Sequence, residues 1–307
     1  MTAALIIAAG KTQHREKFDP MRPVGGLSAV QRLVRVYQQA GICRIVLVAQ
    51  DLEAVEKHVA RMGVVCLQNG CADAEMLDSV KIGLAYLQGK CERVQVTPVS
   101  VPLYTVETVK RLAALHEPLV IPLHEHASGH PVQLGAELFG NIIDYEGPGG
   151  LAGAIQALGM QRLFVEVPDA GVLLNIEQNG DYEELLARHS LNRLLPVVRL
   201  NISREDYAYG PGTQQLLRLV NDTQSLRLAC QQMGISYGKG WKMVNNIEAM
   251  FDGGVLVRQP GGKHGGGTTV TEKGQRIIAR YDAWVKASRE KVEELFNETF
   301  LGPDGKL

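Results

Sequence analysis

The sequence has no apolar run long enough to cross a bilayer. Its N-terminal apolar segment, ALIIAAG from Ala4 to Gly10, is far shorter than the ~20 residues that a membrane-spanning helix needs. This segment also lacks the basic flank and the cleavage pattern of a signal peptide. We therefore expect no membrane partner, and the segment itself is typical of a buried β-strand.

The sequence is also poor in cysteine and has almost no net charge. Its five cysteines are odd in number, scattered and without a C-x-x-C pair, so neither a disulfide framework nor a zinc site is indicated. Reduced thiols favour a cytoplasmic location. The formal net charge of −1 indicates neither an acidic nor a basic partner for the chain as a whole.

What is present is enough chain for two domains, since 307 residues exceed one typical domain. Short β-branched runs alternate with amphipathic helical stretches as far as about residue 190, which predicts a parallel sheet flanked by helices. The strands are expected at 3–8, 44–49, 93–99 and 118–123, and the helices include 28–40 and 75–88. The alternation then stops, and we place the domain boundary between residues 196 and 197.

The second domain has the spacing of a helix-turn-helix. Helices are expected at 211–221, 225–233, 236–251 and 272–298, with Gly234 in the turn between the second and the third. Hydroxyl, amide and ammonium groups at the start of the third helix suit contacts with phosphates and base edges. The alternative is an ordinary solvated helix face. The candidate DNA contacts on this helix are Ser236, Tyr237, Lys239, Lys242 and Asn245.

The glycine-rich stretch GGKHGGG, residues 261–267, lies between two β-prone segments. A phosphate-binding loop would instead join a strand to a helix, so we interpret the stretch as the tip of a wing, with a plain flexible hairpin as the alternative. Arg258, Lys263 and His264 are its candidate DNA contacts. Residues 225–281 carry eight basic and three acidic residues, a local basic excess that a DNA-binding surface requires.

Specific motifs of this domain resemble one known family. They are YGPGTQQLL, DTQSLRLAC, MGISYGKGWKM, GGxxGGG and TEKG. Together they resemble the winged-helix DNA-binding domain of ModE-type molybdate-responsive regulators over about residues 197–298. The resemblance implies double-stranded DNA as partner and a homodimer formed through the long last helix. Molybdate-binding domains follow in that family, whereas this sequence ends at Leu307, so we do not expect direct molybdate sensing.

Motifs of the first domain resemble another family. LIIAAGKTQHREKFDPMRPVGG, SVPLYT, GHPV and VLLNIEQNGDY are similar to those of MobA/MocA-like nucleotidyltransferases, which attach a nucleotide to molybdopterin. This resemblance covers about residues 1–190 and implies a Rossmann-like α/β nucleotidyltransferase fold that uses magnesium. The nucleotide-binding candidates that it gives are Ala9, Gly10, Lys11, Arg15, Lys17, Gly25, Gly26 and His130.

The departures from that family concern charge. Ser100 stands where the family has an aspartate, and Asp19 stands where it has a lysine. Asn175 occupies the other metal position, with Glu177 as a nearby carboxylate. Nucleotidyl transfer needs a carboxylate-held Mg²⁺, so the fold is expected to persist with impaired catalysis, and we name no catalytic residue and no firm metal ligand.

The sequence thus predicts a dimeric, DNA-binding transcription regulator linked to molybdenum-cofactor metabolism. Its degenerate nucleotidyltransferase domain, residues 1–196, would sense a nucleotide such as CTP or GTP, with or without magnesium, or a molybdopterin-like ligand. Residues 197–307 would bind DNA. One alternative is an active cytidylyl- or guanylyltransferase in which the winged helix serves dimerisation or autoregulation. Another is a structural partner of a cofactor enzyme.

Overall fold

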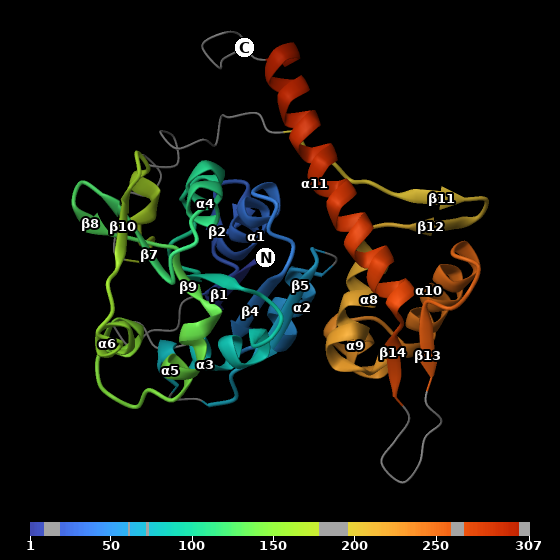
Figure 1. The fold of residues 1–307 in the computed structure, drawn as a ribbon, viewed down its shortest axis with the longest axis horizontal. Helices are drawn as coiled ribbons and strands as arrows, with labels where there is room; N and C mark the ends of the chain where they lie inside the picture. Colours follow the sequence, from blue (N-terminus) through green and yellow to red (C-terminus); the bar gives the residue numbers. More distant parts are fainter. Residues whose placement is uncertain (9–18, 61, 72–73, 178–195, 259–266, 301–307) are drawn as a thin grey trace. The chain divides into compact units, whose positions relative to one another are not determined.

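The computed structural model describes residues 1–8, 19–60, 62–71, 74–177, 196–258 and 267–300 (Figure 1). The chain forms two compact units, an N-terminal unit of residues 1–193 and a C-terminal unit of residues 194–307. The predicted boundary after residue 196 lies close to this division. None of the described helices combines the length and the apolarity that crossing a membrane requires.

The N-terminal unit is built on one large sheet. Its strands follow the order β10-β7-β9-β6-β1-β4-β5, with β8 paired to β7. The four predicted strands are confirmed as β1, β4, β6 and β7. The strands of the sheet are β1 (Thr2–Ala8), β4 (Ile45–Ala49), β5 (Val64–Gln68), β6 (Arg93–Pro98), β7 (Leu119–His124), β8 (Ala127–Ser128), β9 (Val132–Gly135) and β10 (Leu163–Glu166).

The sheet is mixed, so the prediction of a parallel sheet was wrong in part. Strands β4, β1 and β6 are parallel neighbours, and β10 is parallel to β7, but β9 is antiparallel to both β6 and β7. After β7 the chain turns back through β8 and enters the sheet as β9, so that β7 is separated from β6. Strand β9 has only four residues, too few for its direction to be inferred from its apolar pattern.

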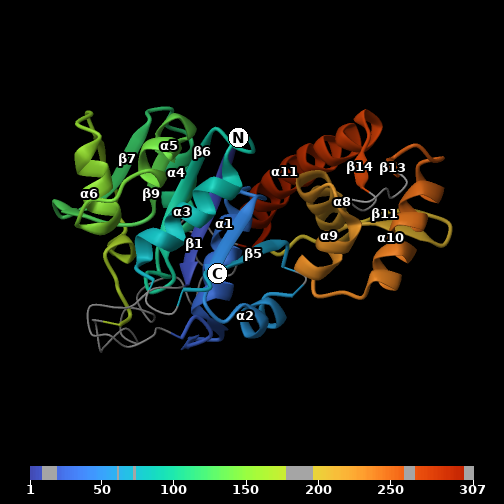
Figure 2. The ribbon, with the colours of Figure 1, turned by 90° about the horizontal axis from the view of Figure 1, so that it is seen from below.

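Helices cover both faces of this sheet (Figures 1 and 2). One face packs on α1, α2 and α4, which share a core with the alternate residues of β1 and β4. The opposite face packs on α3, where Gly83 lies against the Leu5 side chain, and α5 and α6 pack on α3. The bounds are α1 (Ala29–Gln39), α2 (Leu52–His58), α3 (Met76–Leu87), α4 (Val106–Ala113), α5 (Phe139–Ile143) and α6 (Gly150–Ala157).

The two predicted crossover helices are confirmed as α1 and α3. Ser28 is the N-cap of α1, as predicted, and its hydroxyl accepts a hydrogen bond from the Gln31 N–H. Gly41, just beyond the helix, has φ of +83°, a conformation that favours glycine. The smaller elements of the unit are a hairpin of β2 (Pro23–Val24) and β3 (Leu27–Ser28) and the short helices η1 (Ala136–Leu138) and η2 (Ala170–Val172).

The C-terminal unit is a winged helix-turn-helix followed by a long helix. All four predicted helices are confirmed, as are the two strands of the wing. In chain order the elements are β11 (Ile202–Arg204), β12 (Tyr207–Tyr209), α8 (Pro211–Thr223), α9 (Leu226–Gln232), α10 (Tyr237–Met250), β13 (Leu256–Arg258), β14 (Thr268–Val270) and α11 (Glu272–Phe300).

The core of this unit is centred on aromatic residues. Tyr209, at the end of the unpredicted hairpin β11–β12, packs edge-on against Phe251 and Tyr281. The Tyr281 hydroxyl donates to the Leu200 carbonyl at 2.8 Å. These contacts attach the hairpin and α11 to the helix-turn-helix, so the long helix is anchored by its first half.

Candidate functional sites

The first candidate site lies at the carboxyl edge of the N-terminal sheet. β1 and β6 end side by side there, and the Val99 N–H donates to the Ile7 carbonyl at 2.9 Å. Ser100 follows directly and is buried. This edge is where parallel α/β sheets bind their ligands. The predicted Ala9, Gly10, Lys11, Arg15 and Lys17 follow β1 in the sequence and lie outside the described residues.

The three residues of the predicted metal region come together at this edge. The Ile176 N–H donates to the Ser100 carbonyl at 2.9 Å, so Asn175 and Glu177 flank a residue that is bonded to Ser100. The Asn175 side-chain oxygen accepts from the Glu177 N–H at 3.0 Å. A hydroxyl, an amide and a single carboxylate are a poor donor set for Mg²⁺, which is usually held by carboxylates. Among the residues that the structure describes, these three therefore do not fit a magnesium centre of the nucleotidyltransferase type.

His130 is bonded to the segment 170–177, which also contains Asn175. Its N–H donates to the Val172 carbonyl at 2.8 Å, and it precedes Pro131 through a cis peptide bond. Its Nδ1 is buried and has no hydrogen-bond partner within the described part of the chain. Burial lowers the pKa of His130 to about 4. The ring is therefore neutral at physiological pH and keeps one nitrogen available for a hydrogen bond.

Asp169, which the sequence analysis missed, fixes the neighbouring loops. Its carboxylate accepts from the Thr105 N–H at 2.8 Å, from the hydroxyls of Thr105 and Thr108 at 2.9 and 2.5 Å, and from the Gly171 N–H at 3.0 Å. Four hydrogen bonds fill the usual accepting capacity of a carboxylate. The Asp-Ala-Gly sequence predicts a local turn, but it gives no sign of the bonds to the start of α4.

Two glycines pack these loops tightly together. A Cβ on Gly171 would lie 2.1 Å from the Leu103 carbonyl oxygen, and one on Gly129 would lie 2.5 Å from the Val172 carbonyl oxygen. Both partner atoms belong to the backbone and cannot rotate away. Segments 99–105, 129–131 and 170–177 therefore form one close-packed edge around Ser100 and His130.

The glycine pair that was predicted to bind a nucleotide, Gly25 and Gly26, forms a turn. Gly25 and Gly26 connect β2 to β3, and Gly25 has φ of +68°. Gly26 is exposed, and a Cβ there would meet nothing within 4 Å. Its backbone is thus accessible to a ligand. Asp19, at the position of the family lysine, accepts from the Met21 N–H at 2.8 Å, a turn-forming contact that lysine cannot make.

The second candidate site is the helix-turn-helix of the C-terminal unit. Gly234 has φ of +60°, and the Ile235 N–H donates to the Cys230 carbonyl at 3.0 Å, which ends α9 in a tight turn. The two helices then cross closely, because a Cβ on Gly240 would lie 2.1 Å from the Cys230 sulfur. The predicted inward residues Leu226, Ala229, Val244, Ile247 and Met250 are buried, while Trp241 and Met233 are half-buried.

The predicted DNA-contacting face of α10 is exposed. It comprises Ser236, Tyr237, Lys239, Lys242 and Asn245. The Ser236 hydroxyl is the N-cap and accepts from the Lys239 N–H, so its acceptor role is already partly used. Tyr237 is 46% exposed, packs edge-on against Trp241 and lies beneath the Arg227 guanidinium at 5.7 Å. This aromatic side chain is therefore oriented at the helix start, where the helix dipole favours phosphate.

The base of the wing is attached to α10 and α8 by hydrogen bonds. Strands β13 and β14 are antiparallel, with Arg258 opposite Thr268, and the glycine run lies between them. The Glu248 carboxylate of α10 accepts from the N–H groups of Val255 and Leu256, and the Thr268 N–H donates to the Gln224 carbonyl. The base of the wing is thus bonded to both α10 and the end of α8. Lys263 and His264 lie outside the described residues.

Comparison with known proteins accounts for the N-terminal unit. The family described as MobA-like NTP transferase domain matches residues 4–163, which is more than half of the chain. The chain belongs to this family. A nucleotidyl transferase from Methanothermobacter thermautotroptrophicus is similar in structure, with a TM-score of 0.53 and 18% identity over 61% of this chain and 97% of that one. This likeness supports the nucleotidyltransferase fold.

A C-terminal segment is similar to molybdenum-related proteins. It is 32% identical over 84 residues to the molybdenum-pterin-binding protein MopB of Rhodobacter capsulatus, covering 27% of this chain and 31% of that protein. It is 29% identical over 91 residues to the DNA-binding transcriptional dual regulator ModE of Escherichia coli K12, covering 30% and 35%. The chain spans about a third of the length of these curated relatives.

Proposed function

We propose that this protein is a DNA-binding transcription regulator linked to molybdenum-cofactor metabolism. In this proposal the C-terminal unit binds double-stranded DNA as a homodimer, and the NTP transferase-like unit binds a nucleotide or a pterin-like ligand. The observation that carries the proposal is the exposed start of α10. Two lysines, an oriented tyrosine and a positive helix end lie there, next to a wing.

The test of DNA binding is a pair of matched double variants. Replacing Lys239 and Lys242 with alanine is expected to weaken duplex binding about tenfold and to reduce the salt slope by about 2, because each lysine neutralises one phosphate. The control removes Lys57 and Lys110, two exposed lysines of the N-terminal unit. Fluorescence anisotropy at several salt concentrations measures both. Equal affinity of the two double variants would exclude α10 as the recognition helix.

For the N-terminal unit we propose ligand binding with slow nucleotidyl transfer or none. The support is the contrast between a preserved sheet edge and a predicted metal region in which Ser100 and Asn175 carry no charge and Glu177 is the carboxylate. Calorimetry with CTP, GTP and ATP, with and without Mg²⁺, measures binding, and pyrophosphate release with a molybdopterin acceptor measures transfer. Binding without release is the expected result. Absence of any binding would contradict the sensor function.

The second candidate function is an active cytidylyl- or guanylyltransferase. The family match and the position of Glu177 beside Ser100 favour it. It requires a metal held by this carboxylate and groups of a bound nucleotide. Rapid pyrophosphate release by the unmodified chain would establish this function and replace the sensor proposal.

A further inference from the structure

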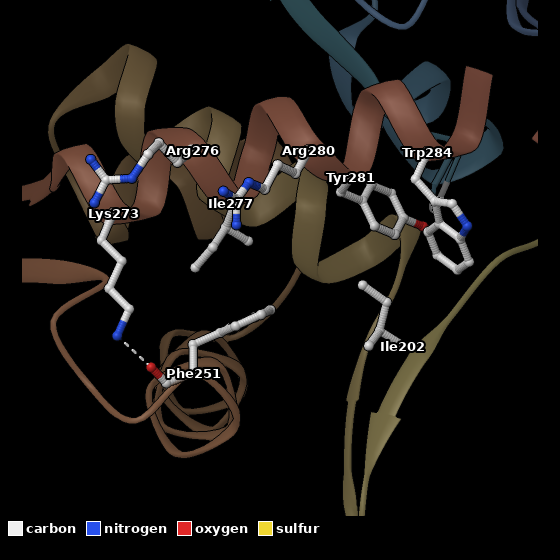
Figure 3. A pocket seen from close by; sticks show the side chains of 8 residues that line it. All are labelled: Ile202, Phe251, Lys273, Arg276, Ile277, Arg280, Tyr281 and Trp284. Carbon is white, nitrogen blue, oxygen red and sulfur yellow. Dashed lines mark hydrogen bonds between the residues drawn. The ribbon is translucent and has the colours of Figure 1, made fainter. Parts of the chain in front are cut away.

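A groove in the C-terminal unit has no role in either candidate site (Figure 3). Its volume of about 500 Å³ lies within the range of pockets that hold small organic molecules. Ile202 of β11 and Phe251 after α10 form one side, and α11 forms the other. The groove therefore lies where the hairpin β11–β12, the helix-turn-helix and the long helix meet.

The α11 side of the groove is one continuous stripe of the helix. Residues three or four positions apart lie on the same face of a helix, and the α11 residues that line the groove follow this spacing. They are Lys273, Arg276, Ile277, Arg280, Tyr281 and Trp284. Two successive turns thus each place an arginine beside an isoleucine or a tyrosine.

The apolar part of the groove is aromatic and held in place. Trp284 packs edge-on against Tyr281, with ring centroids 5.9 Å apart, and Tyr281 is itself buried against Tyr209. Trp284 is nevertheless 40% exposed and Ile202 38% exposed, so the apolar surface faces solvent. A preformed surface of this kind binds a flat apolar molecule without a large entropy cost of ordering.

The basic part of the groove retains hydrogen-bond donors. The Lys273 ammonium donates to the Phe251 carbonyl at 2.5 Å, so its position is fixed. Arg276 makes a 3.8 Å contact with Glu272, in which both side chains are exposed, and Arg280 has no ion-pair partner among the described residues. A guanidinium has five N–H donors. Within the described part of the chain, both arginines therefore have donors left for a ligand.

The nearby carboxylates are already engaged elsewhere. Asp282 pairs with Arg218 at 2.5 Å and also accepts from the Gln214 side-chain amide at 2.6 Å. Asp252, which follows α10 closely, pairs with Arg204 at 2.8 Å. The described residues that line the groove include no acidic side chain. The charge of the groove therefore favours an anion.

An aromatic groove beside two arginines favours molecules that have two parts. A flat apolar body matches the aromatic surface, and planar guanidinium groups bind carboxylates and phosphates through paired hydrogen bonds. Arg276 and Arg280 are one helical turn apart, so both can reach a single acidic group. An inorganic anion would leave the aromatic surface uncovered, and a neutral apolar molecule would leave the arginines unpaired.

We propose that the groove binds a small amphipathic anion, a molecule with a flat apolar body and one carboxylate or phosphate group, and that this ligand acts on α10. The action on α10 rests on the DNA binding of the proposed function. Phe251 is the C-cap of α10, and its N–H donates to the Ile247 carbonyl at 3.1 Å. A ligand that contacts Phe251 therefore touches the helix that would enter DNA.

The two tryptophans of the chain show where a probe binds. The probe is anilinonaphthalene sulfonate, which joins flat apolar rings to one acidic group. Fluorotryptophan labelling gives one fluorine NMR signal for Trp241 and one for Trp284, assigned with Trp284→Phe. The probe is expected to shift the Trp284 signal, and its titration then gives the affinity at this groove alone. A shift of the Trp241 signal only, or of neither, would overturn the proposal.

A matched pair of double variants tests the role of charge. Replacing Arg276 and Arg280 with glutamine is expected to weaken binding of the sulfonate about tenfold, because its charge-assisted hydrogen bonds are lost. Binding of phenylnaphthylamine, which has the same rings without the charge, should not change. The control replaces Lys286 and Lys291, exposed residues of α11 outside the groove, with glutamine. Equal affinity of both double variants for the sulfonate would overturn the proposal.

Competition tests the acidic group and the rival occupant. Naphthyl phosphate or naphthylacetate is expected to displace the sulfonate from the groove, and the stronger competitor shows whether phosphate or carboxylate is preferred. Failure of both would overturn the proposal. A second copy of the chain is the other occupant that an apolar groove can hold. An affinity for the sulfonate that falls as the chain self-associates, followed by sedimentation equilibrium, would show that a second copy fills the groove and would overturn the proposal.

Duplex binding tests the action on α10. Saturation of the groove with the sulfonate is expected to change the duplex affinity of the unmodified chain about fivefold or more, as coupled sites typically do. The variant that lacks Arg276 and Arg280 should not respond at the same probe concentration. Unchanged affinity with the groove saturated would overturn the action on α10. A chain that binds the probe beside Trp284 but binds no duplex would contradict the regulator function and leave the ligand site intact.

Discussion

At the residue scale, the lowered pKa of His130 makes the stability of the N-terminal unit depend on pH. Burial lowers the pKa of His130 from 6.5 to about 4 in the folded chain. Between these two pH values the unfolded chain therefore binds a proton on His130, whereas the folded chain does not. The contribution of His130 to stability is therefore undiminished above pH 6.5. It falls as the pH drops from 6.5 to 4, by up to about 3 kcal/mol.

We expect His130→Gln to remove this part of the pH dependence, while His126→Gln, at an exposed position of the same segment, leaves it in place. Urea unfolding followed by circular dichroism at pH 7.5 and pH 4.5 measures it. Tryptophan fluorescence identifies the transition of the C-terminal unit, which holds both tryptophans, Trp241 and Trp284. Identical pH dependence of the two variants would argue against a neutral His130 ring with a buried Nδ1.

Ser100 gives a second prediction at this scale. Ser100→Asp places a carboxylate at a buried position beside Asn175 and Glu177, which is expected to lower the stability by about 1–3 kcal/mol without metal. Mg²⁺ should then recover part of this loss by binding the folded state. The control is Ser100→Asn, which has a similar shape without the charge. If millimolar Mg²⁺ raises the Tm of both variants equally, the added carboxylate does not meet a metal there.

Sequence reasoning located some of these residues but not the contacts that fix them. Ser100 and Asn175 were assigned to one region through a family resemblance, since 75 residues separate them and no local pattern joins them. Asp169 was missed because its partners are backbone and hydroxyl groups 61 and 64 residues away. Long-range polar contacts of this kind have no periodicity to detect.

At the scale of elements, periodicity predicted the helices well. The starts of α1, α9 and α10 follow serine N-caps, whose signals are local. The hairpin β11–β12 was not predicted, because its strands have three residues each and β11 is exposed throughout. The direction of β9 was missed for a related reason, since a fully buried strand has the same composition whichever way it runs.

Helix α10 contains two glycines with different roles, and this gives a third prediction. Gly240→Ala is expected to destabilise the C-terminal unit by about 1–3 kcal/mol, because the new Cβ would overlap the buried Cys230 sulfur. Gly238→Ala is expected to stabilise it by about 0.5–1 kcal/mol, since a Cβ there meets nothing within 4 Å and alanine favours a helix. Urea unfolding followed by tryptophan fluorescence compares them, and shifts of the same sign would contradict the close crossing of α9 and α10.

At the scale of the whole molecule, a sensor must couple its two ligands. If the N-terminal unit controls DNA binding, a nucleotide that binds this unit should change the DNA affinity, typically by a factor of about 5 to 150. DNA must then change the nucleotide affinity by the same factor. Titrating operator-length DNA with and without saturating CTP or GTP, and the nucleotide with and without DNA, measures both. A factor of one in either direction would show that the two units act independently.

The loops fixed by Asp169 also suggest how such a protein could arise from an enzyme. Hydrogen bonds to Asp169 and the close contacts of Gly129 and Gly171 hold segments 99–105, 129–131 and 170–177 together. If an ancestor held a metal through an aspartate at position 100, its replacement by serine would remove that ligand and leave these contacts in place. A ligand that met this surface would still find it preorganised, so binding would survive in descendants that no longer turn it over. Selection could then act on ligand binding alone, and a surface that once served catalysis would serve as a ligand-binding site.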